Sequence, residues 1–187
     1  DDKNLIGFDT GPGNALMDDY ISTISENKFD KYGRLASKGI PVEEEIKTFL
    51  TNDFFKKKPP KSLDRLSFIA NYKNLIEKKY SNCDTMATLA EFTVESIIAS
   101  LDLLPQKINN ILITGGGYRN NHLMNRLKHK LKLKFLDERQ TGIKFDYIES
   151  ELVAYLSARS IYKLPFTFPS TTGVSKPTSG GKLYKYL

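Results

Sequence analysis

The sequence predicts an α/β fold with a largely parallel sheet. Short apolar segments, such as Asn110–Thr114, alternate with longer amphipathic segments, such as the one that starts at Asp84. This order is typical of β-α-β units. Two glycine-rich segments each follow a predicted strand and precede a predicted helix. The 187 residues, with 40% hydrophobic and 27% charged side chains, are enough for one globular domain with a sizeable core.

The first quarter of the chain predicts one strand and two helices. Asn4–Phe8 is expected to be a short strand that leads into the first glycine-rich loop. The helix Ala15–Ser25 follows, and Asn14 stands where a side chain would cap it. Phe29–Gly39 has the composition of a loop, and Val42–Phe49 is predicted to be the second helix.

The middle of the chain predicts a basic loop and then two helices. Phe54–Leu63 is lysine-rich, and its two consecutive prolines exclude a helix there. Leu66–Lys78 is predicted to be helical. A long helix starts at Asp84 and ends before Pro105. One face of this helix is apolar, at Ala90, Val94, Ile97, Ile98 and Leu101.

The last part of the chain continues the alternation of strands and helices. We predict strands at Asn110–Thr114 and Lys134–Leu136, and a helix at Asn120–Leu131 between them. Tyr147–Tyr162 is predicted to be an amphipathic helix, and Lys182–Tyr186 a closing strand. The long apolar side chains of that helix are expected in the core, namely Leu152, Tyr155 and Leu156.

The two glycine-rich loops are the candidate ligand sites. They are Gly7–Asn14 (GFDTGPGN) and Thr114–Asn120 (TGGGYRN). Ligands of α/β sheets bind where strands end, and glycines let the backbone approach a flat ring or a phosphate closely. The second loop is neither a GxGxxG fingerprint nor a P-loop. The alternative for either loop is a tight turn followed by a capped helix.

Composition excludes several other classes of site. Cys83 is the only cysteine, so no internal disulfide can form, and we expect a reducing, cytoplasmic compartment. With only His122 and His129 available, we predict no zinc site and no cysteine nucleophile. No apolar run approaches the ~20 residues of a membrane span. The chain does not begin with methionine, so we expect residue 1 not to be a translation start.

The net charge of +6 raises the question of nucleic-acid binding. The basic residues concentrate at Lys56–Lys61 and Arg126–Lys134. In the second stretch apolar residues recur at helical spacing, which makes the lysines the exposed face of an amphipathic helix. We therefore favour a solvated basic surface over a nucleic-acid site.

Particular motifs resemble a known family. The segment Gly115–Met124 (GGGYRNNHLM) is similar to the adenosine-binding motif of sugar kinases with the actin/hexokinase-like fold. Together with Gly7–Asp18 (GFDTGPGNALMD), it resembles the anhydro-N-acetylmuramic acid kinases. Further segments match in family order, namely Asp30-x-x-Gly33-x-x-Ala36-x-x-Gly39, Pro59–Ser62, Asp84–Thr93, Thr141–Ile143, Glu149–Ser150 and Pro169–Gly173.

The resemblance implies a ribonuclease H-like/actin-like ATPase lobe with a mixed sheet flanked by helices. Residues 1–187 would form a single domain, most of the second, adenosine-binding lobe of a two-lobe kinase. We expect this lobe to be incomplete at its N-terminal edge, because a hairpin that precedes the Gly7–Asn14 loop in the family is absent. Apolar surface should be exposed there.

The family's enzymes use ATP and Mg²⁺ to phosphorylate 1,6-anhydro-N-acetylmuramic acid while water opens the anhydro ring, giving N-acetylmuramic acid 6-phosphate for cell-wall recycling. The resemblance implies nucleotide-binding residues at Gly115, Gly116, Gly117 and Asn120. It implies a cleft loop on the phosphate or sugar side at Asp9, Gly11, Gly13 and Asn14. It also implies a sugar contact from Glu149, and it allows a homodimer.

For two of these residues a structural role is an open alternative. Asp9 could hold its own loop through backbone hydrogen bonds, and Glu149 could serve the dipole of its helix. No catalytic base and no metal ligand is assigned, because the family's catalytic aspartate lies in a glycine-rich segment absent from these residues.

Three functions follow from the sequence. The first is the C-terminal lobe of such a kinase, inactive alone. The second is an inactive remnant of a truncated gene. The third is a basic nucleic-acid-binding module that reuses the fold.

Overall fold

The structure, a computed structural model, describes residues 5–184 apart from the side chain of Arg65. The chain divides into two compact units. The larger unit consists of Thr10–Lys57 and Leu63–Asp137, and the smaller of Asp1–Asp9, Lys58–Ser62 and Glu138–Leu187.

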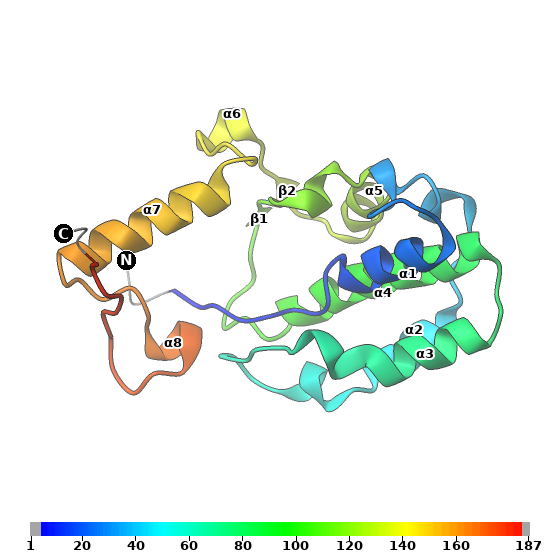
Figure 1. The fold of residues 1–187 in the computed structure, drawn as a ribbon, viewed down its shortest axis with the longest axis horizontal. Coiled ribbons are helices and arrows are strands. Elements are labelled where there is room, and N and C mark those ends of the chain that lie inside the picture. Colours follow the sequence, from blue (N-terminus) through cyan, green and yellow to red (C-terminus); the bar gives the residue numbers. More distant parts are fainter. Residues whose placement is uncertain (1–4, 185–187) are drawn as a thin grey trace. The chain divides into compact units, whose positions relative to one another are not determined.

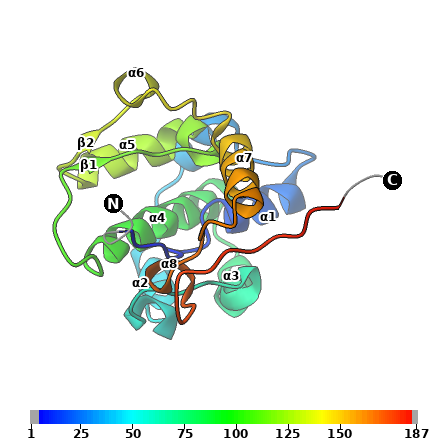
Figure 2. The ribbon, with the colours of Figure 1, turned by 90° about the vertical axis from the view of Figure 1, so that its left-hand side faces the viewer.

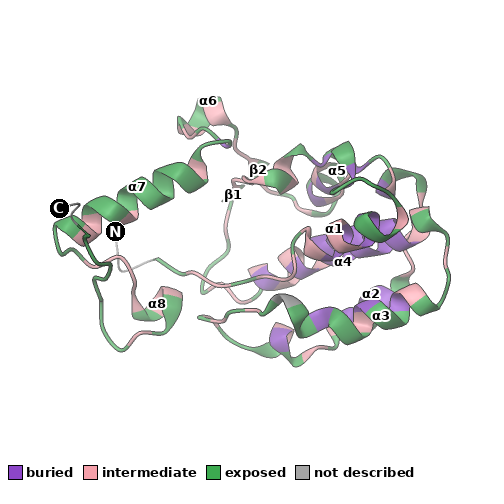
Figure 3. Ribbon diagram, in the orientation of Figure 1, coloured by how far each residue is buried: buried purple, intermediate pink, exposed green. Residues whose placement is uncertain are grey.

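The larger unit is built around one long helix, α4 (Asn82–Leu101). In both ribbon views α4 lies between α5 (Asn121–Lys130) on one side and α2 (Glu43–Leu50) on the other (Figures 1 and 2). The helix α1 (Ala15–Ile24) packs beside it, and α3 (Ile69–Glu77) packs on α2. The middle of α4, residues 85–94, is buried on every face (Figure 3), as expected of a helix at the centre of a core.

The core beside α4 is rich in phenylalanine. The rings of Phe49 and Phe92 stack with their centroids 4.5 Å apart. Phe68 meets Phe92 edge-on at 5.2 Å, and both side chains are fully buried. Such offset and edge-to-face pairs stabilise a core beyond the burial of their apolar area.

The helix boundaries follow from local hydrogen bonds. α4 begins at Asn82, two residues before the predicted start, because the Ser81 hydroxyl accepts from the Asp84 amide at 3.1 Å. The Asp84 carboxylate accepts from the Ile40 amide at 2.7 Å and from the Ser81 hydroxyl, and these bonds lower its pKa. The cap therefore also fixes the chain at Ile40 against α4.

The predicted helices of the larger unit are confirmed, with one change. Val42–Phe49 appears as α2, and Asn120–Leu131 as α5. Leu66–Lys78 is divided into a 3₁₀ turn and α3. The unit holds five 3₁₀ turns among its described residues, namely η2 (Lys31–Gly33), η3 (Ala36–Lys38), η4 (Asp53–Lys56), η5 (Arg65–Phe68) and η6 (Gly116–Arg119).

The sheet is much smaller than predicted. β1 (Asn110–Ile111) and β2 (Lys134–Phe135) pair in parallel, with Asn110 opposite Lys134. Leu5–Phe8 is not a strand, which corrects the prediction for the described part of that segment. Lys182–Tyr184 is not a strand either, and the rest of that predicted strand lies outside the described residues. The fold is a helix-rich α/β arrangement with a two-stranded parallel sheet.

The smaller unit contains α6 (Glu138–Thr141), α7 (Ile148–Ile161) and α8 (Pro169–Thr172). The extended chain at Gly7 joins it, because the Gly7 amide donates to the Ser170 carbonyl at 3.1 Å. The Asp9 amide likewise donates to the Lys61 carbonyl at 3.0 Å. The backbone of this N-terminal stretch is thus paired with loops rather than with strands.

The predicted core face of α7 is wrong. Leu152 and Tyr155 are each 54% exposed, and no residue of α7 is buried (Figure 3). Within its unit α7 is held mainly at its end, where Arg159 donates to the Pro165 carbonyl and the Ser160 hydroxyl donates to the Gly180 carbonyl. No helix among residues 5–184 combines the length and the apolar character that crossing a membrane requires.

A buried ion cluster joins α4 to α5. Glu91 on α4 is 3% exposed, and its two carboxylate oxygens each accept a 2.7 Å hydrogen bond from Arg126 on α5. Lys130 lies 2.5 Å from the same carboxylate and also pairs with Glu95. Burial disfavours the charged carboxylate, but the bonds from Arg126 and Lys130 outweigh it, so the pKa of Glu91 is lowered.

We predict that Glu91→Gln destabilises the fold by about 2 kcal/mol, less than the ~3–5 kcal/mol for breaking a fully buried pair. The reason is that the side chains of Arg126 and Lys130 remain 35% and 27% exposed and can be rehydrated. Urea unfolding measures the change, and Glu95→Gln, which also loses a Lys130 contact, is the control with a smaller effect.

The ion pairs of Glu91 also predict that the stability of the fold depends on pH. A lowered pKa means that the contribution of Glu91 is fully present above the unfolded pKa of Glu and is lost as the pH falls through the folded value. The difference in unfolding free energy between the wild type and Glu91→Gln should therefore shrink below about pH 4. A difference that is constant down to strong acid would contradict this role.

Candidate functional site

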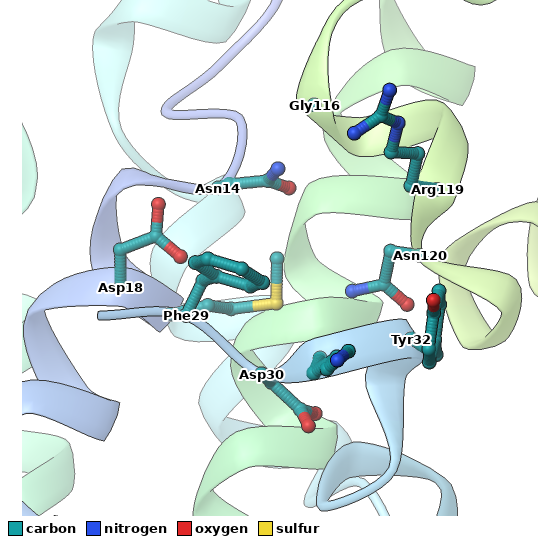
Figure 4. A pocket seen from close by; sticks show the side chains of 10 residues that line it. Asn14, Asp18, Phe29, Asp30, Tyr32, Gly116, Arg119 and Asn120 are labelled. Carbon is teal, nitrogen blue, oxygen red and sulfur yellow. The ribbon is translucent and has the colours of Figure 1, made fainter. Parts of the chain in front are cut away.

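A cavity of about 380 Å³ opens in the larger unit (Figure 4). Its walls come from the start of α1, from the stretch that enters η2, and from η6 with the residue that follows it. The lining residues are Asn14, Met17, Asp18, Phe29, Asp30, Lys31, Tyr32, Gly116, Arg119 and Asn120. The volume lies in the range of small-molecule sites, which is about 300–1,000 Å³.

The cavity brings the two glycine-rich loops together. Of the residues predicted in them, Asn14, Gly116 and Asn120 line it. Gly117 stands next to this wall, since a Cβ built on it would lie 3.7 Å from the Asn14 amide nitrogen. Gly115 has φ +72° and ψ −171°, a backbone conformation that glycine adopts most easily, and it opens η6.

Two glycines of the first loop serve packing against α4 rather than the cavity wall. A Cβ on Gly11 would lie 2.4 Å from the Ser96 hydroxyl oxygen. The carbonyl of Gly13, at φ +58°, accepts a 2.7 Å hydrogen bond from the Thr93 hydroxyl. The loop is therefore anchored on the buried face of α4. Asp9 and the exposed Glu149 belong to the smaller unit.

Asn14 and Asn120 each stand immediately before a helix, but their side chains act differently. The Asn120 side chain caps α5, because its Oδ1 accepts from the Leu123 amide at 3.1 Å. Asn14 makes no such bond to α1, so its predicted cap is wrong. The backbone of Asn14 is already helical, with ψ −7°, whereas capping needs the extended backbone that Asn120 has, with ψ 96°. The Asn14 amide instead lines the cavity.

The segment between α1 and α2 builds the third wall. The Asp30 carboxylate accepts 2.9 Å hydrogen bonds from the amides of Leu35 and Ala36. Gly33, at φ +70°, allows the turn to lie against the second loop, since a Cβ there would lie 2.2 Å from the Asn120 Oδ1.

The same segment ends against α4. Ala36 is fully buried, and a Cβ on Gly39 would lie 2.0 Å from the Cys83 carbonyl oxygen. The spacing Asp-x-x-Gly-x-x-Ala-x-x-Gly thus has a packing reason at each position.

Several lining side chains were not predicted from the sequence. Phe29 and Tyr32 supply aromatic rings, and Tyr32 has φ 63°, which is uncommon for a residue with a side chain. The Arg34 guanidinium lies 5.5 Å from the Tyr32 ring centroid. Asp18 and Arg119 lie inside motifs that marked the site, so the sequence carried a signal for them. For Phe29 and Tyr32 it carried none.

The arrangement suits a flat ligand with polar edges. Aromatic and thioether side chains offer apolar contact, the amides of Asn14 and Asn120 offer hydrogen bonds, and Arg119 adds positive charge. Behind the Gly33 turn, burial and then Arg126 lower the pKa of His122. No group of three or more His, Cys, Asp or Glu side chains in the described part of the chain could hold a metal ion.

Comparison with known proteins places these loops in a family. A profile of the anhydro-N-acetylmuramic acid kinase family matches residues 1–186. Curated proteins named anhydro-N-acetylmuramic acid kinase include one from Methylobacterium nodulans, 38% identical over 95% of this chain and 46% of its own length. Another, from Rhodopseudomonas palustris, is 41% identical over 96% of this chain and 48% of its own length.

A protein with the same name from Zymomonas mobilis is 36% identical over 98% of this chain and 49% of its own length. The chain therefore spans about half the length of the curated relatives it matches. The family profile covers the segments that build the cavity, from the first glycine-rich loop to the end of α5. The chain belongs to the anhydro-N-acetylmuramic acid kinase family.

Proposed function

We propose that this chain supplies the adenosine-binding half of the active site of an anhydro-N-acetylmuramic acid kinase. The observation that carries the proposal is the cavity in which Asn14 of one glycine-rich loop and Gly116 and Asn120 of the other meet. Two loops that are about a hundred residues apart in the sequence share one small-molecule-sized cavity. Membership of a kinase family supports a nucleotide as the ligand proposed for it.

In this proposal residues 1–187 form most of the second lobe of an actin-like, two-lobe kinase. The helix-rich α/β arrangement and the coverage of about half of each relative are consistent with one lobe. The other lobe would carry the catalytic base. The complete enzyme would act in the cytoplasm as part of cell-wall recycling, and it could form a homodimer.

The residues of this chain would bind and orient ATP rather than take a proton from water. The nucleotide base lies in the cavity beside Phe29 and Tyr32. Gly115, Gly116 and Gly117 let the backbone approach the nucleoside. Asn14 of the first loop would face the phosphates or the sugar, and Gly11 and Gly13 hold that loop against α4. From the smaller unit, Asp9 would serve the phosphates or the sugar, and Glu149 the sugar. Positioning of this kind supplies much of the catalysis in phosphoryl transfer.

The overall reaction transfers the γ-phosphoryl group of ATP to the 6-oxygen of 1,6-anhydro-N-acetylmuramic acid. Water adds at the anomeric carbon as the anhydro bond breaks, and ADP and N-acetylmuramic acid 6-phosphate are formed. Mg²⁺ would neutralise charge on the phosphates. The described residues offer no cluster of ligands for a metal, so no step is assigned to Mg²⁺ on this chain.

A bulky side chain at Gly116 should block the site without unfolding the chain. A Cβ on Gly116 meets no atom within 4 Å, and its φ is not in the left-handed region, so Gly116→Leu fills space in the cavity. We expect the rise in melting temperature that ATP causes in the wild type to disappear in this variant, while Gly116→Ala keeps most of it. A full rise in Gly116→Leu would place the nucleotide elsewhere.

The anchor of the first loop should matter for affinity. Thr93→Val removes the hydroxyl that binds the Gly13 carbonyl, and we expect ATP affinity to fall about five-fold. Thr93→Ser should restore it. Thr88→Val is the matched control, because Thr88 is equally buried on α4 but accepts from the Val42 amide. It should lower stability and leave affinity unchanged, as calorimetric titration with ATP can show.

We also expect these 187 residues by themselves to form no N-acetylmuramic acid 6-phosphate from ATP and the anhydro sugar. The reason is that the catalytic base is assigned to the other lobe. A coupled assay for ADP release with the purified chain measures this. Addition of a first lobe from a relative is the positive control. Turnover by the chain alone would show that it carries its own base.

A further inference from the structure

We propose that a second cavity of the larger unit binds a small organic phosphate, that is, a phosphate monoester with an apolar body. This cavity has a volume of about 490 Å³, within the range of small-molecule sites. It is lined by the end of α1, by the segment that carries η2 and η3, and by Asn82 at the start of α4. The proposal goes beyond the kinase function and does not depend on it.

Three cationic side chains from one short segment line this cavity. Lys31 belongs to η2, Lys38 ends η3, and Arg34 lies between the two turns. Within the part of the chain that the structure describes, none of the three forms an ion pair. Lys31 and Arg34 instead lie over the Tyr32 ring, at 5.6 and 5.5 Å from its centroid. Their charges are therefore available to an anionic ligand.

Asp30, the one acidic side chain among the described residues that line this cavity, opposes the cations only weakly. The residue is 9% exposed, and its two carboxylate oxygens accept 2.9 Å hydrogen bonds from the amides of Leu35 and Ala36. These bonds hold the negative charge inside the turn. With three cations against one carboxylate, the lining stays positive, and a hollow lined by one sign of charge concentrates ions of the other sign.

The combination of charge and apolar surface favours an organic phosphate. The Arg34 guanidinium is a fork of donors that fits phosphate oxygens, and the two lysines favour a doubly charged group over a single carboxylate. Ile21, Ile24 and Leu35 line the same cavity, and Ile21 is buried in the core, so this apolar wall is fixed in place. Inorganic phosphate would leave the wall uncovered, whereas the body of an ester can cover it.

The second cavity adjoins the first but is distinct from it. The two share Phe29, Asp30 and Lys31, whereas Arg34 and Lys38 line the second cavity alone. Substitutions of Arg34 and Lys38 therefore test the second cavity without changing the wall of the first.

The probe is phenyl phosphate at about pH 8, where a phosphate monoester carries close to two negative charges. An NMR titration of the full chain should give a dissociation constant of about 1 mM or lower. Arg34→Gln and Lys38→Gln should each weaken binding about ten-fold. Lys28→Gln is the matched control, because it removes the same charge from an exposed position of the same segment that does not line the cavity. It should bind as the wild type does.

Two comparisons test the class of ligand and the place where it binds. Benzoate has a ring and one negative charge, and inorganic phosphate has the charge but no ring. Each should bind about ten-fold more weakly than phenyl phosphate. Gly116→Leu, which fills the first cavity, should bind phenyl phosphate as the wild type does. The proposal is overturned by absence of binding to the wild type, by an equal loss in Lys28→Gln, by a loss in Gly116→Leu, or by equal binding of either comparison ligand. Because no nucleotide is used, this result and that of the ATP titrations are independent.

Discussion

The site depends most on the ion pairs that the buried carboxylate of Glu91 forms with α5. This carboxylate joins α4 to α5 through Arg126 and Lys130, and α5 begins at Asn120. A buried ion pair of this kind adds little net stability, but it is costly to break. It therefore defines the register of α5 on α4, and with it the position of the second glycine-rich loop.

The helix α4 holds the other two walls as well. Its Thr93 hydroxyl binds the Gly13 carbonyl, and Ser96 packs against Gly11. Near its start, Asp84 accepts from the Ile40 amide, at the end of the turn that carries Phe29 and Tyr32. One buried helix thus sets the relative positions of three loops that lie far apart in the sequence. This explains why polar side chains of α4 are buried and hydrogen-bonded.

The glycines of the motifs have different structural roles. Gly11, Gly33 and Gly39 allow close packing, because a Cβ would collide with a neighbouring segment at each. Gly116 lines the cavity with open space beside it, so its lack of a side chain serves the cavity rather than the core. Gly115 also has open space beside it, but its φ of +72° requires the backbone freedom of glycine. The distinction separates residues whose substitution unfolds the chain from residues whose substitution blocks a ligand.

The sequence by itself determined the family and the order of the helices in the larger unit, because each depends on contiguous residues. It also marked both loops of the cavity. Only the tertiary structure decided that Phe29 and Tyr32 join them, that the Asn14 side chain does not cap α1, and that α7 is exposed. The sheet, predicted to be larger, is two short strands. Periodicity records which residues are apolar, whereas burial and strand pairing depend on which segments pack together. That is decided by long-range contacts such as the one between Glu91 and Arg126.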